Sequence, residues 1–269
     1  IEKRPMMNSA YWGQCDVIYT SLCLTALYMA LQKKSARSMI LFGMALSFKL
    51  QTVFFLPALL PLWLRKDIKL RHLALIPAAY MAMMIPAFWG GKSLHHALTV
   101  YTAQASTYNF MTVNGPSLYN FLPASMDRGT LYTMFSGMAM ALGMAMLAIV
   151  CLMVCLHREH ITREGTLLTC LLVLGGVPFF LPKMHERYTF GADVLALAIA
   201  AYNPKRVWLP LLFGLSSYIC YTAGLPGDAI FDLKWATVFQ GAAVALTAAA
   251  LYRSLNEEKA EAALAEVKA

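Results

Sequence analysis

The 269-residue chain is 59% hydrophobic and only 13% charged, with a mean hydropathy of +0.56. A soluble domain is nearer half apolar and a quarter charged, so this composition excludes an ordinary soluble protein and predicts a polytopic membrane protein. The formal net charge of +8 does not indicate nucleic acid binding, because the basic residues fall in short groups between apolar runs, where they set the orientation of membrane spans.

The first predicted span covers residues 15–31, after a polar lead-in at 1–14. The chain begins with Ile1 rather than Met, so we interpret it as a fragment whose N-terminal part is missing. The basic segment KKSAR at 33–37 follows the span and is expected in the cytoplasm, because basic loops mark that side. Asp16, at the opposite end of the span, is then expected outside.

An apolar stretch at residues 39–64 is too short for the topology that its flanks require. Both flanks are basic and belong in the cytoplasm, yet two full spans would need about 40 residues. Lys49 and Gln51 interrupt the stretch, so we predict two short helical arms, 39–48 and 52–64, with these side chains at the tip. Each arm reaches about 15–20 Å, so the tip needs a protein-lined or water-filled cavity. One tilted helix with a snorkelling lysine is the alternative.

Six further spans follow the hairpin. Every second connection between them is basic, as expected if all the basic segments lie on the cytoplasmic side. They cover residues 73–89, 131–156, 166–181, 190–202, 207–223 and 236–252. The longest outer segment, 90–130, is expected to begin with an interfacial amphipathic helix. The predicted fold class is all-α: a polytopic transmembrane bundle of about seven full spans plus a short-helix hairpin over residues 1–253, with a charged cytoplasmic tail at 254–269.

The segment LPKMHERYTF at 181–190 concentrates ionisable groups at the end of a membrane span. Its ionisable residues are Lys183, His185, Glu186, Arg187 and Tyr188. Such groups are costly there and usually face protein or water for a functional reason. An ordinary charged loop is the alternative, but the alternation of basic loops puts this turn on the outer side, where a basic cluster is not expected.

Asp16, Lys49 and the 181–190 turn are all predicted on the outer side. Basic side chains near a membrane surface suit a phosphate attached to a lipid tail, since Arg offers bidentate contacts and Lys a point charge. The sequence has no GxxxxGK[ST] nucleotide-phosphate loop, no GxSxG elbow and no HExxH motif. A lipid-phosphate donor is therefore favoured over ATP.

Three blocks resemble the polytopic glycosyltransferases of the GT-C superfamily: NSAYWGQCDVIYTS at 8–21, LSFKLQTVFFLPALL at 46–60 and PKMHERYTFGADVLALA at 182–198. They are most similar to bacterial mannosyltransferase-like members that use polyprenyl-phosphate sugars, and to dolichyl-phosphate-glucose-dependent enzymes of N-glycan assembly. The blocks keep the order and spacing of that family, and the resemblance covers nearly the whole chain.

This resemblance implies inverting transfer of a mannose- or glucose-like hexose from a polyprenyl phosphate to an acceptor hydroxyl on a glycan, lipid or protein. The expected location is a membrane, a bacterial cell membrane rather than the endoplasmic reticulum, with the active face extracytoplasmic. The lipid-phosphate sugar is a substrate, and neither a cofactor nor a divalent metal is implied.

The resemblance also implies roles for individual residues. The donor phosphate would be held by Lys49, His185 and Arg187. The sugar or acceptor would be bound by Gln14, Asp16, Gln51, Glu186 and Tyr188. The family's usual catalytic base is an Asp in the first large outer loop, and nothing in this sequence corresponds to that loop. Either a missing N-terminal part supplies the base or the chain is inactive alone, with Asp16 as the second choice.

Other classes of protein stay open at this point. A transporter or flippase of a lipid-linked sugar or an ion would also carry a short hairpin and intramembrane charge, although no repeat relates the two halves of the chain. A non-catalytic membrane subunit is a further alternative. A hydrolase or ligase acting on lipid-linked glycans would present a similar cationic site.

Overall fold

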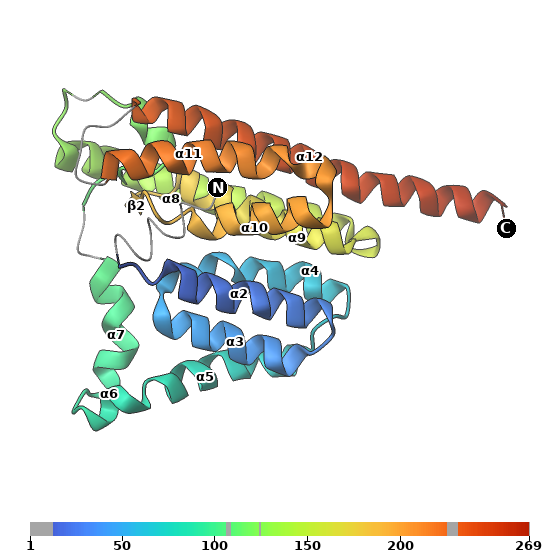
Figure 1. Cartoon of the computed structure of the whole chain (residues 1–269), viewed down its shortest axis with the longest axis horizontal. Helices are drawn as coiled ribbons and strands as arrows, with labels where there is room; N and C mark the ends of the chain where they lie inside the picture. Colours follow the sequence, from blue (N-terminus) through green and yellow to red (C-terminus); the bar gives the residue numbers. More distant parts are fainter. Residues whose placement is uncertain (1–12, 106–108, 124, 225–230, 269) are drawn as a thin grey trace.

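A computed structural model describes residues 13–105, 109–123, 125–224 and 231–268 of the chain. It is an all-α bundle in which most helices lie roughly side by side (Figure 1). Within the described ranges, five helical segments are long and apolar enough to cross a membrane, which makes this a multi-pass integral membrane protein. They are Leu70–Trp89, Arg128–Leu156, Arg163–Phe180, Pro204–Gly224 and Leu233–Asn256.

Two of the seven expected spans are shorter than a membrane-crossing helix. The first, α2 (Asp16–Leu31), has 16 residues and α10 (Phe190–Tyr202) has 13. Five of the seven expected spans therefore have a helix that is long enough to cross a membrane, and two do not. The short α10 packs against α9 (Arg163–Phe180), α11 (Trp208–Gly224) and α2, so its apolar surface is covered by neighbouring helices.

The short-helix hairpin is confirmed, and the single tilted helix is wrong. Helix α3 (Ser35–Phe48) ends where Lys49 takes an extended backbone conformation, with φ −157° and ψ 135°. The chain then turns back along α9 and reaches the start of α3 again, where the Lys69 N–H donates to Ser35 Oγ at 3.0 Å. The tip lies at the same end of the bundle as the start of α2, at the left of Figure 1.

The return arm of the hairpin is irregular rather than one helix at 52–64. It consists of two 3-10 turns, η2 (Leu50–Phe54) and η3 (Leu56–Ala58), followed by α4 (Leu59–Leu64). Pro57 and Pro61 lack the N–H that a continuous α-helix would use, which explains the late start of α4.

The chain leaves the hairpin through η4 (Leu70–Ala74), α5 (Leu75–Met83) and α6 (Ile85–Trp89), and then forms α7 (Leu94–Ala105). Figure 1 shows α7 lying across the direction of the other helices, as an interfacial helix would. Two phenol hydroxyls fix it: Tyr101 donates to the carbonyl of Leu46 at the end of α3, and Tyr80 of α5 donates to the carbonyl of Ala97 at 2.8 Å.

The second half of the chain places α9 at its centre. In the stretch of α9 that would cross the membrane, 78% of the residues are buried, against 22% in the long helix α8 (Arg128–Leu156). The last helix, α12 (Leu233–Lys268), runs without a break into the tail predicted at 254–269. Because α9 is enclosed by its neighbours, the turn that follows it starts from a fixed position.

Gly43 allows α3 and α5 to approach closely. A Cβ at this position would lie 2.7 Å from the Cβ of Ala79 and closer still to the carbonyl oxygen of Ile76. We expect Gly43→Ala to lower the free energy of unfolding by roughly 1–3 kcal/mol, through overpacking. Gly137→Ala in α8, where a Cβ would meet nothing within 4 Å, should not lower it and should raise it by up to about 1 kcal/mol through helix propensity. Thermal melting in detergent would measure both; equal melting curves would contradict the close packing.

Candidate functional site

The charged turn between α9 and α10 is held by a segment of the long loop that precedes α8. Strand β1 (Thr112–Val113) pairs in parallel with β2 (Met184–His185). The Glu186 N–H donates to the carbonyl of Val113 at 3.2 Å, and the Lys183 N–H lies 3.2 Å from the carbonyl of Phe110. A Cβ on Gly115 would lie 2.7 Å from the carbonyl oxygen of Met184, so only glycine fits there. These backbone contacts fix the conformation of the turn.

Two residues beside this ladder have a left-handed backbone conformation that is rare outside glycine. They are Lys183, with φ 65°, and Asn114, with φ 56°. Such conformations cost energy, persist only where the surroundings enforce them and concentrate at functional sites. At Lys183 the effect is to direct the chain from the end of α9 into the ladder.

The hairpin tip meets the start of α2. Lys49 forms an ion pair with Asp16, whose side chain is fully buried. The ammonium of Lys49 also lies 5.7 Å from the ring centroid of Tyr19 and 5.8 Å from that of Tyr188 in the turn. At such distances the aromatic faces attract a cation. The structure therefore brings together Asp16, Lys49 and the turn, three features that the loop charges placed on one side.

The remaining sequence-predicted residues lie around this point, with Gln14 partly buried just before α2. Glu186 is buried, with one carboxylate oxygen 3.4 Å from Nη1 of Arg187 and the other 3.9 Å from Nδ1 of His185. The His185 ring lies 5.0 Å from that of Tyr188, and Gln51 and Tyr188 line the same cavity beside it.

Burial changes the protonation of this cluster. It lowers the pKa of His185 to about 4, and the charges of Arg187 and Lys49 act in the same direction. Burial also raises the pKa of Glu186, against the effect of Arg187, and raises the pKa of the Tyr188 hydroxyl. His185 is therefore a neutral imidazole at physiological pH, which can donate or accept a hydrogen bond but carries no charge.

A cavity of about 1140 Å³ opens beside the cluster, between the hairpin tip, α6, α7, α8 and the turn. Its basic lining residues are Lys49, Lys92, His96, Lys183, His185 and Arg187. None of the described residues that line it carries a carboxylate, since Asp16 and Glu186 are buried behind Lys49 and Arg187. Much of the remaining wall is apolar, with Phe54 and Met140 on facing elements. We call this space the donor cavity, because it is lined by Lys49, His185 and Arg187, the residues expected from the sequence to hold a donor phosphate.

Sequence reasoning missed the contributions of Lys92 and His96. Both precede or belong to α7, four residues apart, and both line the donor cavity. Lys92 lies two residues before the helix and His96 in its first turn, so the helix pattern could have indicated His96 alone, as a polar residue on an interfacial helix. Lys183 belongs to the predicted charged turn but not to the predicted phosphate-binding residues; it also lines the cavity, and its ammonium lies 5.0 Å from the Tyr132 ring centroid.

Among the described residues, no group of three or more His, Cys, Asp or Glu side chains is placed to hold a metal ion. Comparisons of the chain with protein-family models, curated proteins and solved structures gave no match. The resemblance to the GT-C superfamily therefore stays a prediction, and the geometry of the donor cavity is the observation on which a function can be proposed.

The pKa of His185 predicts how stability depends on pH. Because the folded-state pKa, about 4, lies below the ordinary 6.5, the unfolded chain binds the proton first as the pH falls. This histidine therefore lowers stability progressively between pH 6.5 and 4, and has no effect above 6.5. Replacing it by glutamine (His185→Gln) should flatten the pH dependence of the melting temperature in that window. Parallel curves for the two proteins would contradict the shift.

Proposed function

We propose that the protein is a membrane glycosyltransferase that transfers a mannose- or glucose-like hexose from a polyprenyl phosphate to an acceptor hydroxyl. The observation that carries this proposal is the donor cavity, where Lys49 and Arg187, 138 positions apart in the sequence, line one space with no carboxylate among its described lining residues. A cationic cavity with largely apolar walls fits a phosphate that is attached to a lipid.

The phosphate would lie between the hairpin tip and the charged turn. Arg187 provides bidentate contacts, Lys49 provides a point charge, and the neutral imidazole of His185 provides a hydrogen bond. Asp16 and Glu186 stand behind the two cations and hold them in place, while leaving the cavity wall itself positive. Lys92 and Lys183 add two further cations to the same wall.

The prenyl chain would follow the apolar part of the wall. Val53 and Phe54 of the hairpin face this space from one side, and Gly137 and Met140 of α8 from another. Helix α8 is also the most exposed of the long apolar helices after the α5–α6 segment, as expected for a helix in contact with lipid. A lipid could therefore place its phosphate at the cations while its chain stays in the bilayer.

The chemistry is a displacement at the anomeric carbon of the sugar. The acceptor oxygen attacks that carbon, the bond from it to the phosphate oxygen breaks, and the electron pair leaves with the lipid phosphate. Lys49 and Arg187 stabilise the charge that develops there. The hydroxyl proton passes to a base. Asp16 is fully buried and paired with Lys49, an arrangement that supports positioning of that lysine rather than a role as the base.

The test uses the purified protein in lipid nanodiscs with polyprenyl-phosphate mannose or glucose, with and without a bacterial membrane extract as the source of acceptor. Release of free polyprenyl phosphate that depends on the extract supports the proposal. In a parallel vesicle assay, sugar movement across the membrane without bond cleavage would replace it with a transporter. Binding of the donor with neither release nor movement would indicate a non-catalytic subunit.

A further inference from the structure

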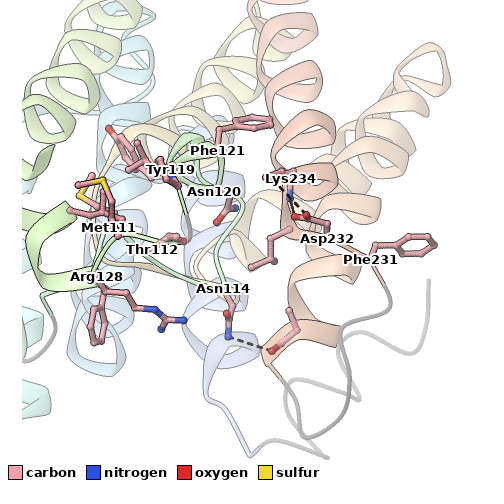
Figure 2. A pocket seen from close by; sticks show the side chains of 17 residues that line it. Met111, Thr112, Asn114, Tyr119, Asn120, Phe121, Arg128, Phe231, Asp232 and Lys234 are labelled. Carbon is pink, nitrogen blue, oxygen red and sulfur yellow. Dashed lines mark hydrogen bonds and ion pairs between the residues drawn. The ribbon is translucent and has the colours of Figure 1, made fainter.

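A second cavity, of about 630 Å³, includes Thr112 of strand β1 in its lining (Figure 2). Thr112 lines this second cavity, whereas Met184, its partner in the ladder, lines the donor cavity. The same division holds on α8, where Leu131 faces the second cavity and the next residue, Tyr132, faces the donor cavity. Neighbouring residues of the same elements therefore line the two cavities.

The lining of the second cavity differs in chemistry from that of the donor cavity. Its aromatic residues are Phe110, Tyr119, Phe121 and Phe231. Its polar residues are Thr112, Asn114, Asn120, Arg128, Asp232 and Lys234. Amide side chains offer both donors and acceptors, the basic side chains offer donors and the carboxylate offers acceptors. Aromatic faces surrounded by such mixed groups suit a ring that has apolar faces and hydroxyls at its edge, which describes a pyranose sugar.

Several of these groups are fixed before any ligand binds. The Asn120 Nδ2 donates to the carbonyl of Gly115 at 2.9 Å and to Thr237 Oγ1 at 3.0 Å, which sets the plane of its amide. The guanidinium of Arg128 lies 5.8 Å from the Phe110 ring centroid and points toward Asn114 in Figure 2. Groups that are already ordered bind a ligand with little loss of conformational entropy.

The position of the second cavity relates it to the donor site. Asn114 forms an isolated bridge with His185, so one residue faces the second cavity and its partner faces the donor cavity. We infer that the second cavity binds the carbohydrate acceptor, and presents its hydroxyl past this bridge to the sugar of the donor. The acceptor role rests on the proposed transferase function, whereas carbohydrate binding in this cavity rests on its own lining.

The experiment measures carbohydrate binding without turnover. Saturation-transfer NMR on the protein in nanodiscs would use methyl α-mannopyranoside and methyl α-glucopyranoside as probes, with inorganic phosphate as the competing anion. At least one pyranoside should bind, and its affinity should fall at least about fivefold in Phe121→Ala, by loss of stacking, and in Arg128→Gln. Both side chains are exposed, so neither change removes a core contact. Polyprenyl phosphate binding should be unchanged in both variants.

Tyr252→Ala, at an exposed aromatic residue on α12, is the matched control and should leave pyranoside binding unchanged. No binding of either pyranoside, equal binding in the two cavity variants, or displacement of the sugar by phosphate would overturn the inference. If pyranosides bind as expected but no lipid phosphate is ever released, carbohydrate binding stands and the transferase function fails. Release of lipid phosphate at the normal rate in both cavity variants would remove the acceptor role alone.

Discussion

Arg187→Ala should reduce the release of polyprenyl phosphate by at least about 100-fold, because a charge-assisted contact of about 3 kcal/mol to the leaving phosphate is lost. Lys49→Ala should have an effect of similar size. Both side chains line the donor cavity. Initial rates of lipid phosphate release from polyprenyl-phosphate mannose or glucose would measure the effect. Arg187→Lys should retain part of the activity, since it keeps the charge but loses the bidentate geometry.

The control is Arg158→Ala, which removes the same charge from an exposed position between α8 and α9. Its rate should equal that of the unmodified protein. If Arg187→Ala and Lys49→Ala both turn over normally, neither residue holds the leaving group, and the assignment of the phosphate site is wrong.

Breaking the Asp16–Lys49 ion pair should have the largest effect on stability. The carboxylate is fully buried and the lysine side chain is 13% exposed. Removal of one partner leaves the other charge buried without compensation, so we expect Asp16→Asn and Lys49→Met each to lower the free energy of unfolding by roughly 3–5 kcal/mol. A thiol-reactive dye that labels the buried Cys23, Cys170 and Cys220 as the protein unfolds would report the melting temperature.

The double variant separates stability from function. Asp16→Asn combined with Lys49→Met removes both charges, so it should recover much of the stability lost in either single variant. It should still release no lipid phosphate, because the cation at the hairpin tip is gone. A double variant whose loss equals the sum of the two single losses would show that the two side chains are not coupled.

The hairpin illustrates what the sequence can predict. The sequence predicts a turn inside the membrane region, because an apolar stretch that is too short for two spans has two basic flanks and a lysine within it. The structure places this turn at Lys49. The same alternation of basic loops places the tip and the 181–190 turn at one end of the bundle. Both predictions rest on charge and length, which are properties of the sequence alone.

Other parts of the site depend on contacts between distant segments. Strands β1 and β2 have two residues each, so neither has a periodic pattern to recognise. The pairing of Asp16 with Lys49 joins residues that are 33 positions apart. His96 lines the donor cavity because α7 crosses the other helices, an orientation that the sequence of α7 alone does not specify. The second cavity combines loop residues with α8, α11 and α12, so tertiary packing alone creates it.

The short lengths of α2 and α10 have a consequence for the membrane itself. At 1.5 Å per residue, these helices are about 24 and 20 Å long, against a hydrocarbon core of ~30 Å. Both begin at the end of the bundle that holds the charged cluster. Helix α10 is enclosed by its neighbours, but α2 exposes Ile18 and Tyr28, and a bilayer thins locally beside an exposed helix that is too short to cross it. The lipid surface should therefore dip above the cluster, so that headgroups and water reach Lys49 and Arg187 at a depth that hydrocarbon would otherwise occupy.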